Sequence, residues 1–177
     1  VRATFTDTAK KSGQAAGPST TTTTSPATKG TLVNGSVAVT GDPLPPIPDS
    51  GTDPAVGRSA PTVNGRNFDG SQVSIGGSKP KIVIVGTHWS PHSLRTFAEV
   101  QKLLDGNATD DVQIYAIATA TDPQRPRFPP AEAFDTTGWK SPIVVDDAEG
   151  SAGHAFGATT FPTAVAIDSS GTVTKRV

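Results

Sequence analysis

Apolar residues beyond residue 60 fall into two patterns, short unbroken runs and a helical repeat. Residues 81–86, KIVIVG, form a β-branched run typical of a fully buried central strand. Residues 91–104 repeat apolar side chains at helical spacing, namely Phe97, Val100, Leu103 and Leu104. A buried strand that leads directly into an amphipathic helix predicts an α/β domain.

Weaker patterns complete the predicted order of elements. Further strands are expected at residues 67–75, 112–118, 143–145, 164–168 and 172–177. Short helices are expected at residues 131–134, which follow two prolines, and at 150–156. The last two strands form a hairpin, because the segment between them, SSG, is rich in turn residues. The predicted order is β-β-α-β-α-β-α-β-β.

The N-terminal third has a different composition. Thr, Ser, Pro, Gly and Ala dominate it, and Phe5 is its single aromatic residue. Such a segment buries too little apolar surface to offset its ordering entropy. We therefore predict a disordered tether over residues 1–58 and a folded domain over residues 59–177. The tether would hold the domain near a membrane or cell wall; the alternative is an inert tail.

Charge and composition exclude several functions. Lys and Arg total 15 against 16 Asp and Glu, a net charge of -1, which argues against a nucleic-acid partner. The sequence has no cysteine, so it offers no disulfide, no thiolate nucleophile and no Cys-ligated metal. We predict no cofactor and no metal site. The chain opens on Val, as expected for a processed or fragmentary product.

Candidate chemistry lies between the central strand and the long helix. In open α/β sheets, ligands collect beyond the carboxyl ends of strands, where helix N-termini point. Here that place is residues 86–93, GTHWSPHS. Ser90 is a good helix N-cap and Pro91 a natural first helical residue. A purely structural interpretation of the segment is therefore also available.

The same segment carries a family resemblance. Residues 89–93, WSPHS, resemble the W-C-x-x-C active site of thioredoxin-fold proteins, specifically W-C-P-H-C, with serine at both cysteine positions. Further segments resemble the TlpA-like thiol–disulfide oxidoreductases (redoxins) in consistent order, namely residues 60–61, 68–75, 79–85, 145–150, 156–158 and 161–171. The resemblance covers residues 60–177 and implies a thioredoxin-like fold, a central mixed β-sheet flanked by helices.

The resemblance also implies roles for individual residues. Ser90 takes the position of the nucleophilic cysteine, Ser93 that of the resolving cysteine, and Pro91 and His92 lie between them, where His92 would favour the thiolate. The implied substrate-binding residues are Trp89, Phe161, Pro162 and Thr163. In the family this proline is cis, and it presents backbone to an extended substrate.

Several residues depart from the family pattern. Thr96 and Ala98 stand where many TlpA-like proteins have Glu and Pro. The chain also ends after its last predicted strand, where a further helix normally covers one face of the sheet, so we expect the C-terminal helix to be lacking. With serine at both sulfur positions, the chain cannot exchange disulfides. Either an active oxidoreductase carries a paired replacement, or a decayed enzyme persists as a peptide-binding module.

Other interpretations remain beside this one. Residues 87–90 could form a peroxiredoxin-like T-x-x-C site with serine, although Val83 stands where proline is expected. His88 and His92 straddle the strand–helix junction, which favours a structural role over a metal pair. The charged stretch 122–127 is most simply a solvated loop, and the Asp146–Asp147 pair a backbone cap.

The resemblance finally implies a partner and a location. The partner is a protein or peptide thiol or disulfide on an exported substrate. We expect an extracytoplasmic domain, periplasmic or at the cell surface, that reaches a membrane only through an anchor missing from this chain.

Overall fold

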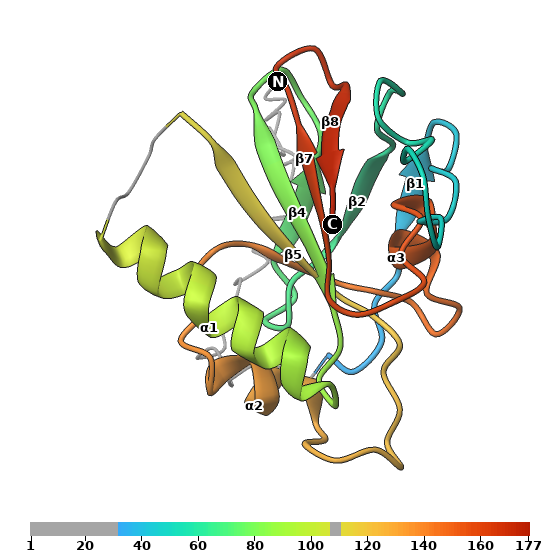
Figure 1. The fold of residues 1–177 in the computed structure, drawn as a ribbon. Helices are drawn as coiled ribbons and strands as arrows, with labels where there is room; N and C mark the ends of the chain where they lie inside the picture. The colour runs from blue at the N-terminus through green and yellow to red at the C-terminus, as the bar shows by residue number, and fades with distance from the viewer. Residues whose placement is uncertain (1–31, 107–110) are drawn as a thin grey trace, which may run out of the picture.

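The computed structural model describes residues 32–106 and 111–177 and contains an eight-stranded mixed sheet (Figure 1). The strands are β1 (Ala38–Thr40), β2 (Thr62–Arg66), β3 (Gln72–Ile75), β4 (Lys81–Gly86), β5 (Gln113–Ala118), β6 (Ile143–Val145), β7 (Thr163–Ile167) and β8 (Val173–Arg176). The helices are α1 (Pro91–Gly106), α2 (Pro130–Asp135) and α3 (Ser151–Ala155).

The sheet is mixed because its central strands run in both directions. Its order is β1-β2-β6-β5-β4-β7-β8, and β3 pairs with β2 outside this path. β4 is parallel to β5 and antiparallel to β7, and β5 is parallel to β6. The predicted α/β class with a central mixed sheet is therefore confirmed.

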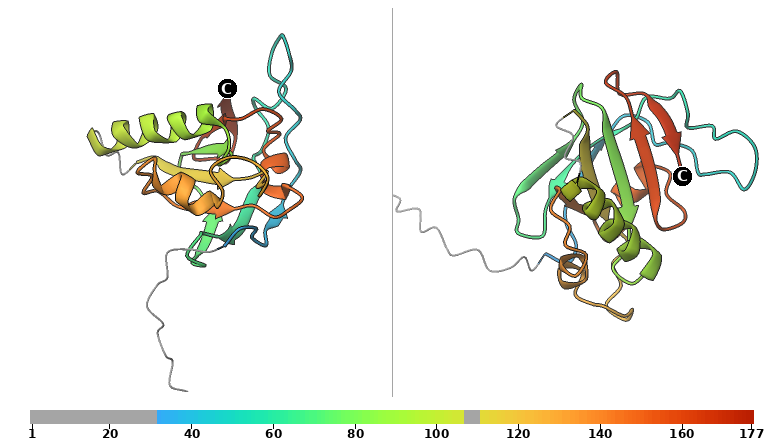
Figure 2. Two further views of the ribbon diagram at one scale, coloured as in Figure 1. Left: turned by 90° about the horizontal axis from the view of Figure 1, so that it is seen from below. Right: turned by 60° about the vertical axis from the view of Figure 1, so that its left-hand side comes forward.

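Helices cover the two faces of the sheet. Successive side chains of a strand point to opposite faces. Val83 and Val85 therefore belong to the same apolar cluster as Phe156, which follows α3, whereas Ile84 packs in the cluster that contains Phe97 of α1 and Phe134 of α2. Figures 1 and 2 show α1 and α2 together on one side of the sheet, away from α3.

The stripe of α1 that faces the sheet differs from the predicted one. The buried residues of the helix are Ser93, Phe97 and Gln101, spaced four apart, whereas Leu103 is 66% exposed. Gln101 tolerates burial because its amide is satisfied: it donates to the Asp105 carboxylate at 2.9 Å and accepts from the Lys140 N–H at 2.9 Å. Two of the three buried residues are polar, so a search for apolar spacing does not find this face of the helix.

The predicted strand at residues 67–75 is wrong in its first half. A turn over residues 67–70 separates β2 from β3, so only Gln72–Ile75 of the predicted range is a strand. Asp69 stabilises the turn, because its carboxylate accepts from the Ser71 N–H at 2.9 Å, and Gly70 has a φ of +82°. A left-handed residue at this position favours glycine.

Part of the predicted tether packs against the domain. Residues 1–31 lie outside the described residues, but residues 32–58 do not follow the prediction of disorder. β1 pairs antiparallel with β2, and the side chains of Leu44 and Ala55 are buried in the cluster on the α3 side. A few apolar residues anchor this segment to the domain, although its average composition predicts no ordered structure.

A buried arginine holds this segment in place. The Arg176 side chain of β8 is 0% exposed, and its Nη2 lies 2.6 Å from Asp53 Oδ1. Its Nε donates to Asp53 Oδ2 at 2.9 Å, and its Nη1 donates to the carbonyl oxygens of Pro45 at 2.7 Å and Phe156 at 3.2 Å. Burial alone would raise the pKa of Asp53, but hydrogen bonds and charge from Arg176, with the Ala55 N–H, outweigh it and lower that pKa.

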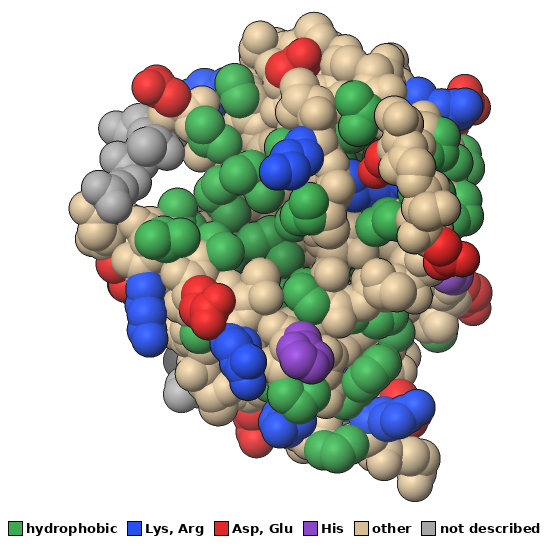
Figure 3. Space-filling view, in the orientation of Figure 1, with side chains coloured by type: hydrophobic (Ala, Val, Ile, Leu, Met, Phe, Trp, Pro, Cys, Tyr) green, Lys and Arg blue, Asp and Glu red, His purple; other side chains and the backbone are tan. Residues whose placement is uncertain are grey.

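Within residues 32–106 and 111–177, no helix follows β8. Hydrophobic side chains gather over the strands above α1 in Figure 3. Ile82 of β4 and Ala164 of β7 are only partly buried and pack against the cluster beneath α1. No helix within residues 32–106 and 111–177 is long and apolar enough to cross a membrane.

Removing the Asp53 carboxylate will destabilise the fold. Asp53→Ala leaves the buried Arg176 guanidinium without its ion-pair partner, so we expect the free energy of unfolding to fall by about 3 kcal/mol at pH 7. Denaturant unfolding measures it. Asp49→Ala, which removes an exposed carboxylate from the same segment, is the control and should change little.

The difference between wild type and Asp53→Ala should also depend on pH. A depressed folded-state pKa gives stability that is complete above the unfolded value of about 3.9 and is lost as pH falls through the folded value. The difference should therefore be constant above about pH 5 and shrink below about pH 4. An unchanged difference at pH 3 would contradict the ion pair.

Candidate functional site

The first turn of α1 begins directly beyond the end of β4. Ser90 caps it as predicted: Ser90 Oγ accepts from the Ser93 N–H at 3.2 Å, and the Ser90 carbonyl accepts from the Leu94 N–H at 3.1 Å. Thr87 Oγ1 in turn accepts from the Ser90 N–H at 3.2 Å. Pro91 is the first helical residue, where its missing N–H costs no hydrogen bond.

The helix lies very close to the strand end because Gly86 has no side chain. A Cβ on Gly86 would lie 2.7 Å from Phe97 Cε2 and 3.1 Å from Ser93 Cβ. Contacts this short do not occur between real Cβ atoms and their neighbours, so a larger residue would push α1 away. Glycine at this position therefore places Ser93 against the strand.

The two serines have different surroundings. Ser90 is 6% exposed and Ser93 is 0% exposed. Ser93 Oγ has no hydrogen-bond partner within the described residues, although a buried hydroxyl normally has one. Pro91 and His92, between them, are exposed. The site thus has a rim position and a sealed position beneath it.

Trp89 and Phe161 meet at the rim of the site. Their rings pack edge to face with centroids 6.3 Å apart, and Trp89 Nε1 donates to the Ala120 carbonyl at 2.9 Å. The bond from Phe161 to Pro162 is cis. Thr163 is buried, and its hydroxyl donates to the Thr160 carbonyl at 2.8 Å. Phe161, which lies just before β7, therefore contacts Trp89, which lies just before α1.

His88 joins the site to the loop between β5 and α2. The side chain is 1% exposed, its Nε2 accepts from the Asp122 N–H at 3.3 Å, and its Nδ1 lies 3.2 Å from the Arg127 carbonyl oxygen. Because Nε2 is the acceptor, Nδ1 carries the proton and donates to Arg127. These contacts are structural, in agreement with the predicted role of His88, and no three potential metal ligands cluster within the described residues.

The charged stretch 122–127, predicted to be a solvated loop, contacts the site. Arg127 Nη1 donates to the Trp89 carbonyl at 3.2 Å, and the Arg125 guanidinium lies 5.0 Å from the Trp89 ring centroid. Ala120 and Arg127 have positive φ values of 48° and 64°, which bend the loop back toward β4. Backbone conformations of this kind in non-glycine residues leave no pattern in a sequence.

The Asp146–Asp147 pair caps α3, as predicted. The Asp146 carboxylate accepts from the N–H groups of Ala152 at 2.8 Å and Gly153 at 2.9 Å. Burial would raise the pKa of Asp147, but hydrogen bonds from Ser151 and neighbouring N–H groups lower it. Both carboxylates are engaged in capping, so the pair does not form a second reactive centre.

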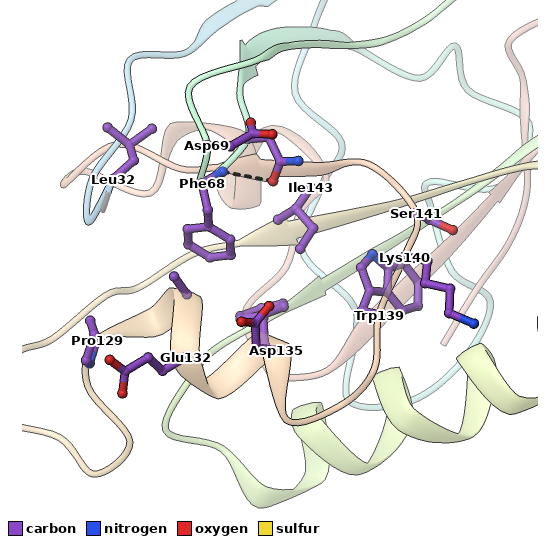
Figure 4. A pocket seen from close by; sticks show the side chains of 13 residues that line it. Leu32, Phe68, Asp69, Pro129, Glu132, Asp135, Trp139, Lys140, Ser141 and Ile143 are labelled. Atoms are coloured by element: carbon purple, nitrogen blue, oxygen red, sulfur yellow. Dashed lines mark hydrogen bonds between the residues drawn. The ribbon is translucent and has the colours of Figure 1, made fainter. Parts of the chain in front are cut away.

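A separate cavity of about 670 Å³ lies beside α2 (Figure 4). Phe68, Trp139 and Ile143 supply apolar walls, and Glu132 and Asp135 lie on the α2 side. The Trp139 ring packs on the Phe97 ring with centroids 5.1 Å apart, against the apolar cluster beneath α1. The predicted site residues do not line this cavity.

The comparisons with known proteins show a thioredoxin-like fold. The thioredoxin domain of a thiol-disulfide oxidoreductase from Bacteroides vulgatus matches 69% of this chain and 87% of its own, with 16% identity and a TM-score of 0.57. StoA from Bacillus subtilis matches 70% and 90%, with 20% identity and a TM-score of 0.56. A thiol:disulfide interchange protein of the thioredoxin family from Chlorobium tepidum matches 68% and 85%, with 22% identity and a TM-score of 0.55.

No family model matches the chain, and no curated protein matches it. Identities this low show the fold alone. Two of these neighbours are named as a thiol-disulfide oxidoreductase and a thiol:disulfide interchange protein, and the predicted thioredoxin-like fold is confirmed. The 177 residues contain no cysteine, so the chain as it stands is not redox-active.

Opposite changes in stability should follow when each serine loses its hydroxyl. Ser90→Ala removes the N-cap and should lower the free energy of unfolding by about 1 kcal/mol. Ser93→Ala removes a buried unpaired hydroxyl and should raise it by about 1 kcal/mol. Denaturant unfolding of the two variants, each the control of the other, measures this, and equal signs would contradict the geometry.

The contacts of His88 should keep the loop over the site. His88→Phe leaves the Asp122 N–H and the Arg127 carbonyl without their partner, so stability should fall by about 2 kcal/mol. Amide hydrogen exchange at Asp122 should also be faster in this variant, because the N–H has lost its acceptor. His92→Phe makes the same change at an exposed histidine and should alter neither quantity. Unchanged exchange at Asp122 in His88→Phe would refute the contact.

Proposed function

We propose that this domain is a thiol–disulfide oxidoreductase scaffold for exported protein substrates, held in a redox-inactive form by serine at both sulfur positions. Ser90 stands for the nucleophilic sulfur and Ser93 for the resolving sulfur. His92 would favour the thiolate and Pro91 sets the start of the helix. The fold of the neighbours and the order of the motifs support this assignment.

The unpaired hydroxyl of Ser93 is the observation that carries the proposal. Its oxygen is fully buried without a hydrogen-bond partner, a position that costs a hydroxyl about 1–3 kcal/mol. A thiol or disulfide sulfur is a weak hydrogen-bonding group and loses little in the same place. The pocket beneath Ser90 therefore suits sulfur better than it suits the oxygen that occupies it.

The start of α1 supplies the second element of the proposed reaction. Free N–H groups at a helix N-terminus favour an anion, which lowers the pKa of a cysteine at that position. Serine at the same position has a far higher pKa and forms no useful anion at neutral pH. The scaffold would thus activate a sulfur at position 90, whereas the present side chain can only cap the helix.

The proposed substrate is an extended segment of a protein or peptide. It would lie across a lip formed by Trp89, Phe161, Pro162 and Thr163, so that its thiol or disulfide faces Ser90. Edge-to-face packing of Trp89 on Phe161 gives this lip a rigid apolar surface. The composition of residues 1–31 and the family resemblance support a location outside the cytoplasm, with an anchor beyond this chain.

The same lip supports a second proposal, a non-catalytic peptide-binding module. The observation in its favour is that the lip is assembled although no cysteine is present in the chain. In this case binding at the lip is the whole activity.

Restoring both sulfurs tests the first proposal. In Ser90→Cys with Ser93→Cys, we expect a reversible disulfide with a potential between about -270 and -120 mV, together with exchange on a protein disulfide. Equilibration against glutathione and dithiothreitol buffers gives the potential. Ser90→Cys alone is the control, and it should form a mixed disulfide that no second thiol releases.

Two results would decide against the oxidoreductase. Either the two thiols fail to pair, or they pair without any exchange with a protein disulfide. If the unaltered serine chain still binds extended peptides, and Trp89→Ala abolishes that binding, the peptide-binding module is the better account.

A further inference from the structure

Two arginines of the loop between β5 and α2 lie at the rim of the candidate site. Arg125 lies over the face of the Trp89 ring, 5.0 Å from its centroid, and Arg127 Nη1 donates to the Trp89 carbonyl at 3.2 Å. Both side chains are exposed to solvent. Trp89 therefore contacts two cations: Arg125 lies against its ring, and Arg127 binds its backbone carbonyl.

The loop holds these cations in place before any ligand arrives. Trp89 Nε1 donates to the Ala120 carbonyl, and the buried His88 ring bridges the Asp122 N–H and the Arg127 carbonyl. These contacts fix the backbone on both sides of Arg125. Groups already held in position lose less entropy when they bind a partner.

The net charge of this rim is positive. The Asp122 carboxylate lies 3.5 Å from Arg125 Nε, in a pair whose side chains are 44% and 59% exposed. Exposed pairs of this kind contribute about 0–1 kcal/mol, so a ligand carboxylate can replace Asp122. Arg127 and the exposed Arg95 of α1 add two further cations around the same helix end, and Glu132, which lines a pocket with Arg127, adds one carboxylate, so the balance stays positive.

We propose that the lip selects an acidic segment, an extended protein strand with carboxylate side chains beside the residue that faces Ser90. This rests on the proposed function, because it names the substrate class of the same site. The planar guanidinium of arginine matches a carboxylate with two parallel hydrogen bonds. Arg125 and Arg127 would bind these carboxylates while Trp89 and Phe161 pack against the substrate backbone.

Two matched peptides test this selection with the unaltered chain. Both are nine residues long with a central serine; one has Asp and Glu on either side, and the other has Asn and Gln. Calorimetry should show about fivefold tighter binding of the acidic peptide at low salt, from two exposed charge contacts. The ratio should fall below about twofold in 0.5 M NaCl, where the Debye length is only about 4 Å.

Charge substitutions locate the effect. Arg125→Gln should lower the preference for the acidic peptide, and Arg125→Gln with Arg127→Gln should abolish it. Within the described residues the Arg125 guanidinium donates no hydrogen bond to the backbone, and the hydrogen bond from the Arg125 N–H to the Asp122 carbonyl is kept in any variant. Arg125→Gln therefore tests the charge without disturbing the loop, and Arg125→Lys should retain most of the preference. Arg58→Gln is the matched control, because Arg58 lies near the β7–β8 turn at the other end of the sheet.

The cysteine-restored chain separates this proposal from the function beneath it. Each peptide now carries a central cysteine in a mixed disulfide with glutathione. The thiolate at position 90 attacks the peptide sulfur and releases glutathione thiolate, and the thiolate at position 93 then displaces the peptide thiolate and closes the disulfide between positions 90 and 93. Glutathione release should be several-fold faster from the acidic peptide.

Each result has one meaning. Equal binding of the two peptides by the unaltered chain, or a preference that survives removal of both arginines, overturns the acidic selection. Equal exchange with both peptide disulfides also overturns it and leaves the oxidoreductase proposal standing. Tighter binding of the acidic peptide without any exchange by the restored chain supports the selection and refutes the oxidoreductase.

Discussion

The close approach of α1 to the end of β4 is the constraint on which the site depends. Gly86 leaves room for the Phe97 ring and the Ser93 Cβ where a side chain would otherwise lie. This contact fixes the first turn of the helix over the strand end. It places Ser90 at the rim with its helical N–H groups, and Ser93 out of contact with water. The same docking buries Phe97 against Phe134, so α2 is held through α1.

In the proposed function, recognition and chemistry would be carried by different parts of this fold. The lip joins two segments that are distant in sequence, around Trp89 and Phe161, and the Ala120 carbonyl holds Trp89 from a third. These contacts are aromatic packing and a hydrogen bond, and they need no sulfur. The chemistry depends on the atoms at positions 90 and 93 alone. A domain of this kind can lose its reaction and keep its binding surface.

The sequence predicts best where burial and local structure agree. The bounds of β4 and β6 follow from their apolar runs, and the start of α1 follows from Ser90 and Pro91, since capping depends on neighbouring residues. The thioredoxin-like order of motifs is equally visible. The substrate lip is an expectation from the family resemblance and stays a prediction; the structure shows only that Trp89 and Phe161 are in contact.

Other features depend on contacts that no local pattern encodes. β1 has three exposed residues, so hydrophobicity gives no sign of its pairing with β2. The sequence predicts a solvated loop at residues 122–127, and its arginines are exposed. Its position nevertheless depends on a hydrogen bond to the buried His88. The buried face of α1 differs from the predicted one because Gln101 is polar. Its burial is possible because its amide is hydrogen-bonded, and hydrophobicity gives no sign of this.

The ion pair between Arg176 and Asp53 changes where the folded unit begins. These residues are 123 positions apart, and the contact joins the last strand to a segment whose composition resembles a linker. Composition alone would divide the chain near residue 59. A domain cut there would keep every strand from β2 to β8 and every element of the site. It would nevertheless lose the Asp53 carboxylate and the Pro45 carbonyl that bind the Arg176 guanidinium, together with the segment that covers it. The autonomous unit of this protein therefore includes residues that look like tether.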